Sequence, residues 1–273
     1  MNKVCFGSVI YTSAIKFADD FLRSLEAQTN RDFTLLLVND DVDEKELMGL
    51  LNRYNIKNKI VSYQEQLSPA ELRIRLLLEA KKDGVDYLVL GDIDDYFSVN
   101  RVETCVENLD RQKKISFVYN DLYESNGDRI MPELPLEVGD YGDILNHNYL
   151  GLSNTALNLS HLSFDFLDSL HGIKTHVFDW YLFSRLLLNG AEGRFVNDTC
   201  TYYRFHENNF VGMPSNTADL LEKELQVKEE HYKLLSKFSD NYMLMYKAYF
   251  DRNYRLNSAQ RLYYWWDLTR GNI

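Results

Sequence analysis

Three carboxylates stand within four residues directly after an apolar run in YLVLGDIDDYF, residues 87–97. Asp92, Asp94 and Asp95 repel one another, so their charges cost free energy unless a metal ion, a basic side chain or water lies among them. Side chains two apart in an extended segment point the same way, roughly 6–7 Å apart. A divalent cation could meet one carboxylate while the other holds a nearby hydroxyl, because Mg²⁺ and Mn²⁺ prefer oxygen ligands. A solvated loop or a helix N-cap would use the same residues without any chemistry.

Two later stretches carry residue types that catalysis uses. Asp179 stands at the start of FDWYLFSRLLLNG, residues 178–190, where the helix dipole favours an acid whatever its role. The run TYYRFH, residues 201–206, ends in Arg204 and His206. Taken singly, neither Asp179 nor His206 distinguishes a site from ordinary structure. The other histidines have no supporting pattern and are interpreted as structural: His147, His161, His171, His176 and His231.

The first third of the chain predicts elements that would bring acids together. Apolar strand-like runs at 4–13, 33–41, 59–63 and 87–95 alternate with helical patterns at 14–28, 44–54 and 68–84. The last of these helices has Ser68 as N-cap and Pro69 in its first turn. Such alternation predicts a parallel α/β sheet with helices on both faces. Ligands bind beyond the carboxyl ends of such strands, where NDD (39–41) and DIDD (92–95) both stand.

After residue 98 the pattern changes. We expect a helix over 99–111, a strand over 115–123, a hairpin turn at Asn126-Gly127, a helix over 178–190 and a strand over 194–206. Residues 130–160 look irregular, with loops and short helices, and the chain looks helical from Ser215 onward. The predicted domains are 1–212, with halves at 1–98 and 99–212, and a helical C-terminal extension at 213–273.

Composition excludes some partners. The 273 residues carry 30 Lys and Arg against 41 Asp and Glu, a net charge of −11, which argues against nucleic acid as a partner. Cys5, Cys105 and Cys200 are isolated, so they indicate neither a zinc site nor a disulfide framework, and they favour a reducing, cytoplasmic setting. We see no signal peptide and no run near the ~20 apolar residues of a membrane span.

Five motifs in a fixed order carry a resemblance to a known family. LVND (37–40), ELRIR (71–75), YLVLGDIDDYF, FDWYLFSRLLLNG and YYRFH together resemble the family 2 glycosyltransferases, which are inverting enzymes of GT-A fold. The resemblance covers about residues 4–210. It implies a Rossmann-like nucleotide-binding sheet with helices on both faces, here followed by the helical extension.

The resemblance also implies roles for residues. Thr12 and Asp40 would hold the nucleotide base, Asp92 the ribose, and Arg73 or Arg75 the base or diphosphate. Asp94 would bind Mn²⁺ or Mg²⁺, with Asp95 just behind it, His206 near the metal and Arg204 near the diphosphate. Asp179 would be the general base that takes the proton of the acceptor hydroxyl. The sequence departs from the family pattern at Tyr11-Thr12-Ser13-Ala14, at Asp41-Val42 and at Phe178-Asp179.

The implied activity is transfer of a hexose-type sugar from a nucleotide-diphosphate donor, a UDP-sugar, to a saccharide or a lipid-linked saccharide. The family context suggests bacterial surface polysaccharide synthesis. Two other interpretations use the same residues. DIDDYF resembles the first motif of haloacid-dehalogenase-like phosphatases, with Asp92 and Asp94 as the reacting pair, and a non-catalytic GT-A-like binding protein would keep the acids without the reaction.

The tail, residues 240–273, is rich in large apolar side chains, and several arginines stand near its end. It could pack on the catalytic domain, form a homo-oligomer contact or lie on the inner face of the membrane, where Trp and Tyr suit the interface.

Overall fold

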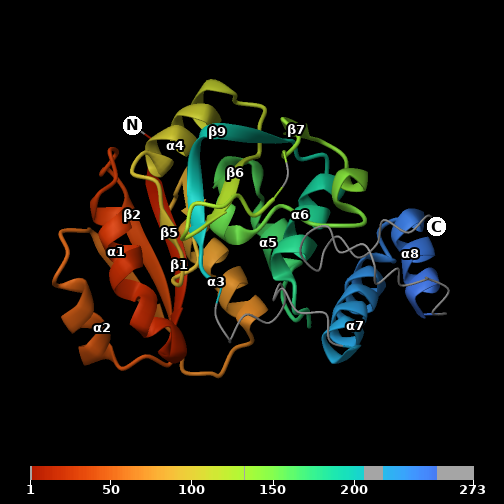
Figure 1. Cartoon of the computed structure of the whole chain (residues 1–273), viewed down its shortest axis with the longest axis horizontal. Helices are drawn as coiled ribbons and strands as arrows, with labels where there is room; N and C mark the ends of the chain where they lie inside the picture. The colour runs from red at the N-terminus through yellow and green to blue at the C-terminus, as the bar shows by residue number, and fades with distance from the viewer. Residues whose placement is uncertain (1, 132, 206–217, 251–273) are drawn as a thin grey trace. The chain divides into compact units, whose positions relative to one another are not determined.

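The computed structural model describes residues 2–131, 133–205 and 218–250 (Figure 1). These residues form two compact units. Of the described residues, the first unit contains 2–131, 133–138, 151–174 and 192–204, and the second contains 139–150, 175–191, 205 and 218–250. The predicted boundary at 212/213 falls outside the described residues and stays a prediction, as does the division at 98/99.

The first unit contains a mixed β-sheet. Its strands, in chain order, are β1 (Val4–Tyr11), β2 (Thr34–Asp40), β3 (Asn58–Ser62), β4 (Tyr87–Leu90), β5 (Tyr96–Phe97), β6 (Phe117–Glu124), β7 (Glu137–Val138), β8 (Thr155–Asn158) and β9 (Gly193–Tyr203). The spatial order is β3-β2-β1-β4-β8-β6-β9-β5, with β7 on β9. The four strands from β3 to β4 are parallel, as the sequence predicts, and Tyr11 lies opposite Asp40 in the β1–β2 register.

The prediction that residues 130–160 form only loops and short helices is wrong for 155–158, which form the buried strand β8. β8 lies there, between β4 and β6, and pairs antiparallel with both. All four of its residues are buried. β5 and β7 are also antiparallel to β9, so the predicted parallel strands are one part of a mixed sheet.

Helices cover both faces of this sheet (Figure 1). They are α1 (Ala18–Glu26), α2 (Glu44–Leu51), α3 (Pro69–Lys82), α4 (Arg101–Arg111) and α5 (Phe164–Asp168). Buried residues of α1, α2 and α4 share one core with alternate residues of β1 and β2. On the opposite face α3 approaches β1 closely: a Cβ at Gly7 would lie 3.3 Å from Leu76 Cδ2. The predicted cap of α3 is confirmed, because Ser68 Oγ accepts the Glu71 N–H at 3.2 Å.

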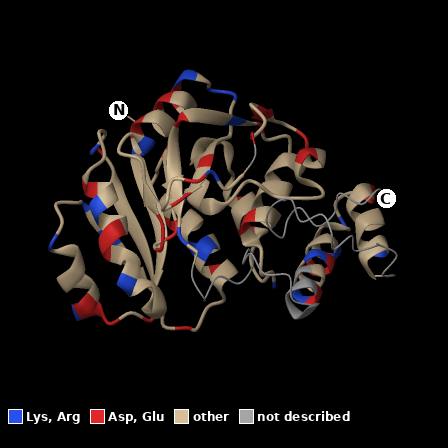
Figure 2. Ribbon diagram, in the orientation of Figure 1, with Lys and Arg blue, Asp and Glu red and all other residues tan. Residues whose placement is uncertain are grey.

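Acidic and basic side chains are mixed on the outer helices of this unit (Figure 2). On α1, Asp19 pairs with Arg23 at 2.6 Å and with Arg53 at 3.0 Å. These side chains are all largely exposed, so solvent screens such pairs and they add little to fold stability. Exposed pairs of this kind are therefore not what holds the first unit together.

The second unit is helical. It contains a short 3₁₀ turn, η2 (Tyr141–Ile144), and the helices α6 (Phe178–Leu188), α7 (Ala218–Leu235) and α8 (Asp240–Phe250). The helical prediction for 218–250 is confirmed, and the predicted final helix lies outside the described residues. Tyr242, Met245 and Tyr249 form the buried stripe of α8. Among the described helices none combines the length and the apolar character needed to cross a bilayer.

Candidate active site

Asp92–Asp95 form a tight turn at the carboxyl end of β4, which we call the carboxylate turn. The preceding Gly91 is required, because a Cβ there would lie 2.7 Å from the Phe6 ring. The Asp95 N–H donates to the Asp92 carbonyl at 3.1 Å, so the segment is a turn and not the extended strand end that the sequence suggested. Ile93 is buried in the core, whereas Asp92 and Asp94 remain partly exposed.

Asp95 is the buried member of the turn, with 1% of its surface exposed. Its carboxylate accepts a short hydrogen bond from the Ser153 hydroxyl and one from the Arg204 N–H at 3.0 Å. Burial raises the pKa of Asp95 well above its usual value, and the charges of Asp94 and Asp92 raise it further. The two hydrogen bonds oppose that rise because they stabilise the ionised form.

Asp92 faces a basic side chain from α3. Arg73 Nη2 lies 3.5 Å from Asp92 Oδ1. Burial raises the pKa of Asp92, Arg73 lowers it, and Asp94 raises it again. Because 37% of the Asp92 side chain is still exposed, solvent screens these effects more than at Asp95.

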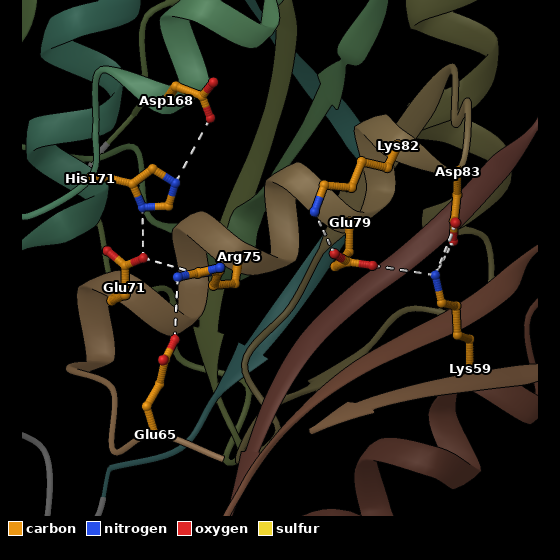
Figure 3. Close-up of polar contacts among 9 residues, drawn as sticks. All are labelled: Lys59, Glu65, Glu71, Arg75, Glu79, Lys82, Asp83, Asp168 and His171. Atoms are coloured by element: carbon orange, nitrogen blue, oxygen red, sulfur yellow. Dashed lines mark hydrogen bonds and ion pairs between the residues drawn. The ribbon is translucent and has the colours of Figure 1, made fainter. Parts of the chain in front are cut away.

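The structure distinguishes the two arginines that the sequence left open. Arg75 donates from Nε to Glu71 at 3.1 Å and from Nη2 to Glu65 at 3.3 Å (Figure 3). Glu71 also meets His171 Nδ1 at 2.6 Å, so Arg75 belongs to a network with Glu65, Glu71 and His171. Two residues along a helix are about 200° apart around its axis, so Arg73 and Arg75 point to different surroundings. Arg73 is the arginine beside Asp92.

The ends of β1 and β2 bring further side chains to the same edge of the sheet. The Tyr11 hydroxyl donates to Asp94 Oδ2 at 3.3 Å, and burial together with Asp94 raises the pKa of that phenol. Thr12 donates from Oγ1 to the Asp41 carbonyl at 3.1 Å. Burial and the Asp41 charge raise the pKa of Asp40. Asp41 adopts a left-handed backbone with φ of 63°, a region that favours glycine.

Arg204 reaches the turn from the end of β9. Its Nε donates to the Asp94 carbonyl at 3.1 Å, and its Nη2 donates to Asp20 at 2.9 Å. The guanidinium also lies 4.9 Å from the centre of the Phe17 ring. His206, the predicted neighbour of the metal, lies outside the described residues.

Asp179 belongs to the second unit. It lies in the first turn of α6, and its Oδ1 accepts the Trp180 N–H at 2.7 Å. The structure therefore brings six of the predicted residues to the sheet edge of the first unit: Thr12, Asp40, Arg73, Asp92, Asp94 and Arg204. Sequence reasoning missed Tyr11, Ser153 and Asp20 there. Only Tyr11 had a signal, since it ends a predicted strand beside Thr12.

No protein-family model and no curated protein sequence matches this chain. Solved structures do. Residues 1–349 of Staphylococcus aureus TarS with UDP-GlcNAc superpose with a TM-score of 0.61 at 16% identity, over 89% of this chain and 73% of that one. Mannosyltransferase PcManGT from Pyrobaculum calidifontis, with GDP-Man and Mn²⁺, gives 0.58 at 12% identity over 90% and 68%. GalNAc-T7 with UDP, GalNAc and Mn²⁺ gives 0.56 at 12% identity over 92% and 56%.

This chain has the GT-A fold. The expectation from the sequence is thus confirmed at the level of fold. In this GT-A sheet the carboxylate turn stands at the carboxyl end of β4, the edge at which open α/β sheets take ligands.

The carboxylate turn suits a divalent cation that takes only part of its coordination from protein. Among the described residues, no three His, Cys, Asp or Glu side chains converge as a metal-binding group. Asp92 and Asp94 nevertheless supply partly exposed carboxylates whose mutual repulsion a cation would relieve. Mg²⁺-type ions commonly bind through one or two carboxylates, with water and substrate phosphates as the other ligands. The residues present therefore fit a cation that arrives with a nucleotide diphosphate.

Proposed function

We propose that this protein is an inverting, metal-dependent glycosyltransferase of family 2 type that transfers a hexose-type sugar from a UDP-sugar to an acceptor hydroxyl. One observation carries the proposal: a turn with two partly exposed carboxylates, flanked by Arg73 and Arg204, stands at the carboxyl end of β4 in a GT-A sheet. A nucleotide diphosphate needs positive charge for its phosphates and hydrogen-bond acceptors for its ribose and base. This edge offers both.

The donor would lie along the ends of β1, β2 and β4. Thr12 and Asp40 would hold the base, Asp92 the ribose and Arg73 the diphosphate, while Arg75 stays with Glu71 and Glu65. Asp40 lies at the end of β2 opposite Tyr11, beside the loop that Thr12 bonds, so both predicted base-binding residues stand at one place. TarS carries UDP-GlcNAc and GalNAc-T7 carries UDP, which supports a UDP-sugar, while PcManGT carries GDP-Man.

Asp94 would hold Mn²⁺ or Mg²⁺, together with His206. The ion would neutralise charge that develops on the departing diphosphate. The structures of PcManGT and GalNAc-T7 contain Mn²⁺, which supports this choice. Arg204 would contribute a second positive charge, because its guanidinium already bonds the Asp94 carbonyl.

Asp179 would accept the proton of the attacking hydroxyl. An inverting transfer needs one base opposite the leaving group, and a carboxylate serves that role. The acceptor would be a saccharide or a lipid-linked saccharide in bacterial surface polysaccharide synthesis, at the cytoplasmic face of the membrane. Residues 240–273 would then provide a peripheral membrane or homo-oligomer contact.

The test combines binding with turnover. Thermal unfolding of the full chain is followed with UDP, with Mn²⁺ and with both, and a panel of nucleotide sugars is assayed for donor hydrolysis. We expect stabilisation by UDP with Mn²⁺ through mass action on the folded state, and hydrolysis of at least one donor. Asp94→Ala should abolish the metal-dependent stabilisation. Asp179→Asn should keep it and lose about 10²–10⁴ in rate.

Other outcomes have distinct meanings. Stabilisation without hydrolysis or transfer of any donor would indicate a non-catalytic binding protein. Cleavage of an aryl phosphate with Mg²⁺, and no response to UDP, would indicate the phosphatase interpretation. Unchanged turnover in Asp179→Asn would move the base to another acid, with Asp165 or Asp143 the next to test.

A further inference from the structure

Ser153 makes two bonds to the carboxylate turn. It lies in a short 3₁₀ segment, η3 (Leu152–Asn154), just before β8, and only 4% of its surface is exposed. Its hydroxyl donates to Asp95 Oδ2 and accepts the Asp92 N–H at 3.2 Å. A hydroxyl has one proton to donate and two lone pairs, so both bonds can exist together. One atom thus ties the first and last residues of the turn, with Asp94 between them.

Arg101 holds Ser153 from behind. It opens α4 and is completely buried. Its Nη2 donates to the carbonyls of Ser153 at 2.9 Å and Thr155 at 3.3 Å, and its Nε donates to Asn120 at 3.1 Å. The guanidinium lies 4.6 Å from the centre of the Phe97 ring. These contacts fix the backbone from which the Ser153 hydroxyl projects.

Arg101 also supplies charge. Burial lowers the pKa of the Arg101 guanidinium to about 10, and Cys105, Asp95, Cys200 and Asp92 oppose that shift. Its remaining nitrogen, Nη1, has no hydrogen-bond partner in the part of the chain that the structure describes. A buried guanidinium that is incompletely paired contributes little net stability. The hydrogen bonds that Arg101 does make fix the backbone at Ser153, and through Ser153 they fix the position of the turn.

We propose that Ser153 is a positioning residue that holds the carboxylate turn so that Asp92 and Asp94 are presented to the metal and nucleotide, and that Arg101 keeps Ser153 in place. The metal and nucleotide in this statement rest on the proposed function. Ser153 touches neither ligand; it acts through Asp92 and Asp95. Without its hydroxyl, the Asp92 N–H and one Asp95 oxygen lose their partner, and the turn can adopt other conformations.

Ser8 provides a matched control for Ser153. Ser8 on β1 is also buried, with 1% of its surface exposed, but its hydroxyl has no partner among the described residues. Ser8→Ala and Ser153→Ala therefore delete the same atom from the same kind of surroundings. They differ in whether that atom holds the turn. Ser153→Thr restores a hydroxyl and serves as the rescue variant.

The first experiment needs no ligand. Amide hydrogen exchange is measured on the full chain for wild type, Ser153→Ala, Ser153→Thr and Ser8→Ala. We expect Ser153→Ala to exchange about tenfold faster at the Asp92 amide, because its acceptor is gone. Ser8→Ala and Ser153→Thr should match wild type there. Unchanged exchange at Asp92 in Ser153→Ala would overturn the positioning role, whatever the protein does.

The second experiment measures Mn²⁺ binding by electron paramagnetic resonance, with UDP present. Loss of a group that supports a metal site typically weakens metal binding about 10–100-fold, and Ser153 supports Asp94 through its neighbours Asp92 and Asp95. We expect a weakening of that size in Ser153→Ala, a return toward wild type in Ser153→Thr and no change in Ser8→Ala. Equal Mn²⁺ affinity in wild type and Ser153→Ala would refute the functional part of the inference. A wild-type chain that binds no Mn²⁺ with UDP would instead refute the proposed function, and hydrogen exchange would still decide whether Ser153 positions the turn.

Discussion

The carboxylate turn and the packing around Trp180 bury ionisable groups in opposite ways. In the turn, Asp95 is buried with hydrogen bonds from Ser153 and Arg204 and with a buried cation, Arg101, nearby. In the second unit, His231 is buried against the Trp180 ring, 3.9 Å between ring centres, and neither ring nitrogen has a partner among the described residues. The first region gives its buried carboxyl group hydrogen-bond partners, whereas the second keeps its buried imidazole neutral.

The second region is an aromatic cluster, which we define as Trp180, His231, Tyr232, Tyr242 and Tyr249. Trp180 donates to the Ile144 carbonyl at 2.7 Å, and Tyr242 donates to Ser184 Oγ at 2.8 Å. Tyr232 and Tyr249 rings lie 5.0 Å apart. Burial of these rings and dispersion between them stabilise the fold. In the carboxylate turn, by contrast, burial of ionisable groups costs free energy, and the result is a fixed arrangement of side chains.

The difference predicts that the largest stability losses come from the aromatic cluster. Trp180→Ala should lower the free energy of unfolding by about 3–5 kcal/mol, because it empties a large buried volume and leaves the Ile144 carbonyl without its donor. Chemical denaturation of the full chain measures this. Trp180→Phe keeps a stacked ring and should lose distinctly less. A loss below about 1 kcal/mol in Trp180→Ala would mean that the cluster can close over the gap.

The pH response sharpens the contrast. Burial lowers the pKa of His231 well below 6.5, with Lys228 adding to the effect, so the folded state holds the neutral ring. As the pH falls below about 6.5, only the unfolded chain gains this proton, and stability falls by up to about 1.4 kcal/mol per pH unit. The other ionisable groups around the ring, Tyr232 and Tyr242, stay neutral in that range.

His231→Phe removes that proton and keeps the stack on Trp180. Between pH 6.5 and 5 the variant should lose about 2 kcal/mol less than wild type in the same denaturation assay. At pH 8 the His231 imidazole is neutral in both the folded and the unfolded chain, so measurements there serve as the internal reference. Parallel stability curves for the two proteins across this range would show that His231 is not buried in its neutral form.

The carboxylate turn should respond more weakly to loss of a single side chain. Arg204→Ala removes the Nε bond to the Asp94 carbonyl and the contact with Phe17, but it keeps the backbone N–H that Asp95 accepts. We expect a loss of about 1–2 kcal/mol, because the pair with Asp20 is solvent-exposed and adds little. Arg204→Lys should not restore the whole loss, since an ammonium cannot replace the planar fork. A loss as large as that of Trp180→Ala would contradict the distinction between the regions.

The two regions also differ in what the sequence revealed. Runs of mostly apolar residues predicted β1, β2 and β4, and they put the acids of DIDD at a strand end, because such a run is a local signal of a buried strand. β8 is as short as β4, but its sequence, TALN, begins and ends with a polar residue and gives no such signal, although it forms a strand between β4 and β6. The antiparallel insertion was therefore invisible in the sequence.

The same reason explains the residues that the sequence missed at the site. Arg101 occupies an ordinary first-turn position of a helix, and Ser153 stands in a stretch without pattern. Their importance arises from contacts over 52 and 58 positions in the chain. The choice between Arg73 and Arg75 likewise depends on how α3 is rotated against the sheet, which packing decides. Side chains that could do chemistry can be recognised from the sequence around them. The groups that hold those side chains in place depend on contacts between distant parts of the chain, so they cannot be recognised in this way.

The smallest expected effect concerns Asp41, which follows β2 and has a left-handed backbone. Asp41 has φ of 63° and is exposed, and an L-residue is less comfortable there than glycine. Asp tolerates this conformation better than most residues, so Asp41→Gly should raise the free energy of unfolding by only about 0.5 kcal/mol. Val42→Ala is unsuitable as a control because Val42 is buried. Asp43→Gly is the better comparison: Asp43 is exposed like Asp41, but its loss removes the N-cap of α2 and should lower the free energy of unfolding. Since the Asp41 charge also raises the pKa of Asp40, titration of Asp40 by NMR should move to lower pH in Asp41→Gly. A loss of stability instead would mean that the Asp41 side chain itself stabilises the loop after β2.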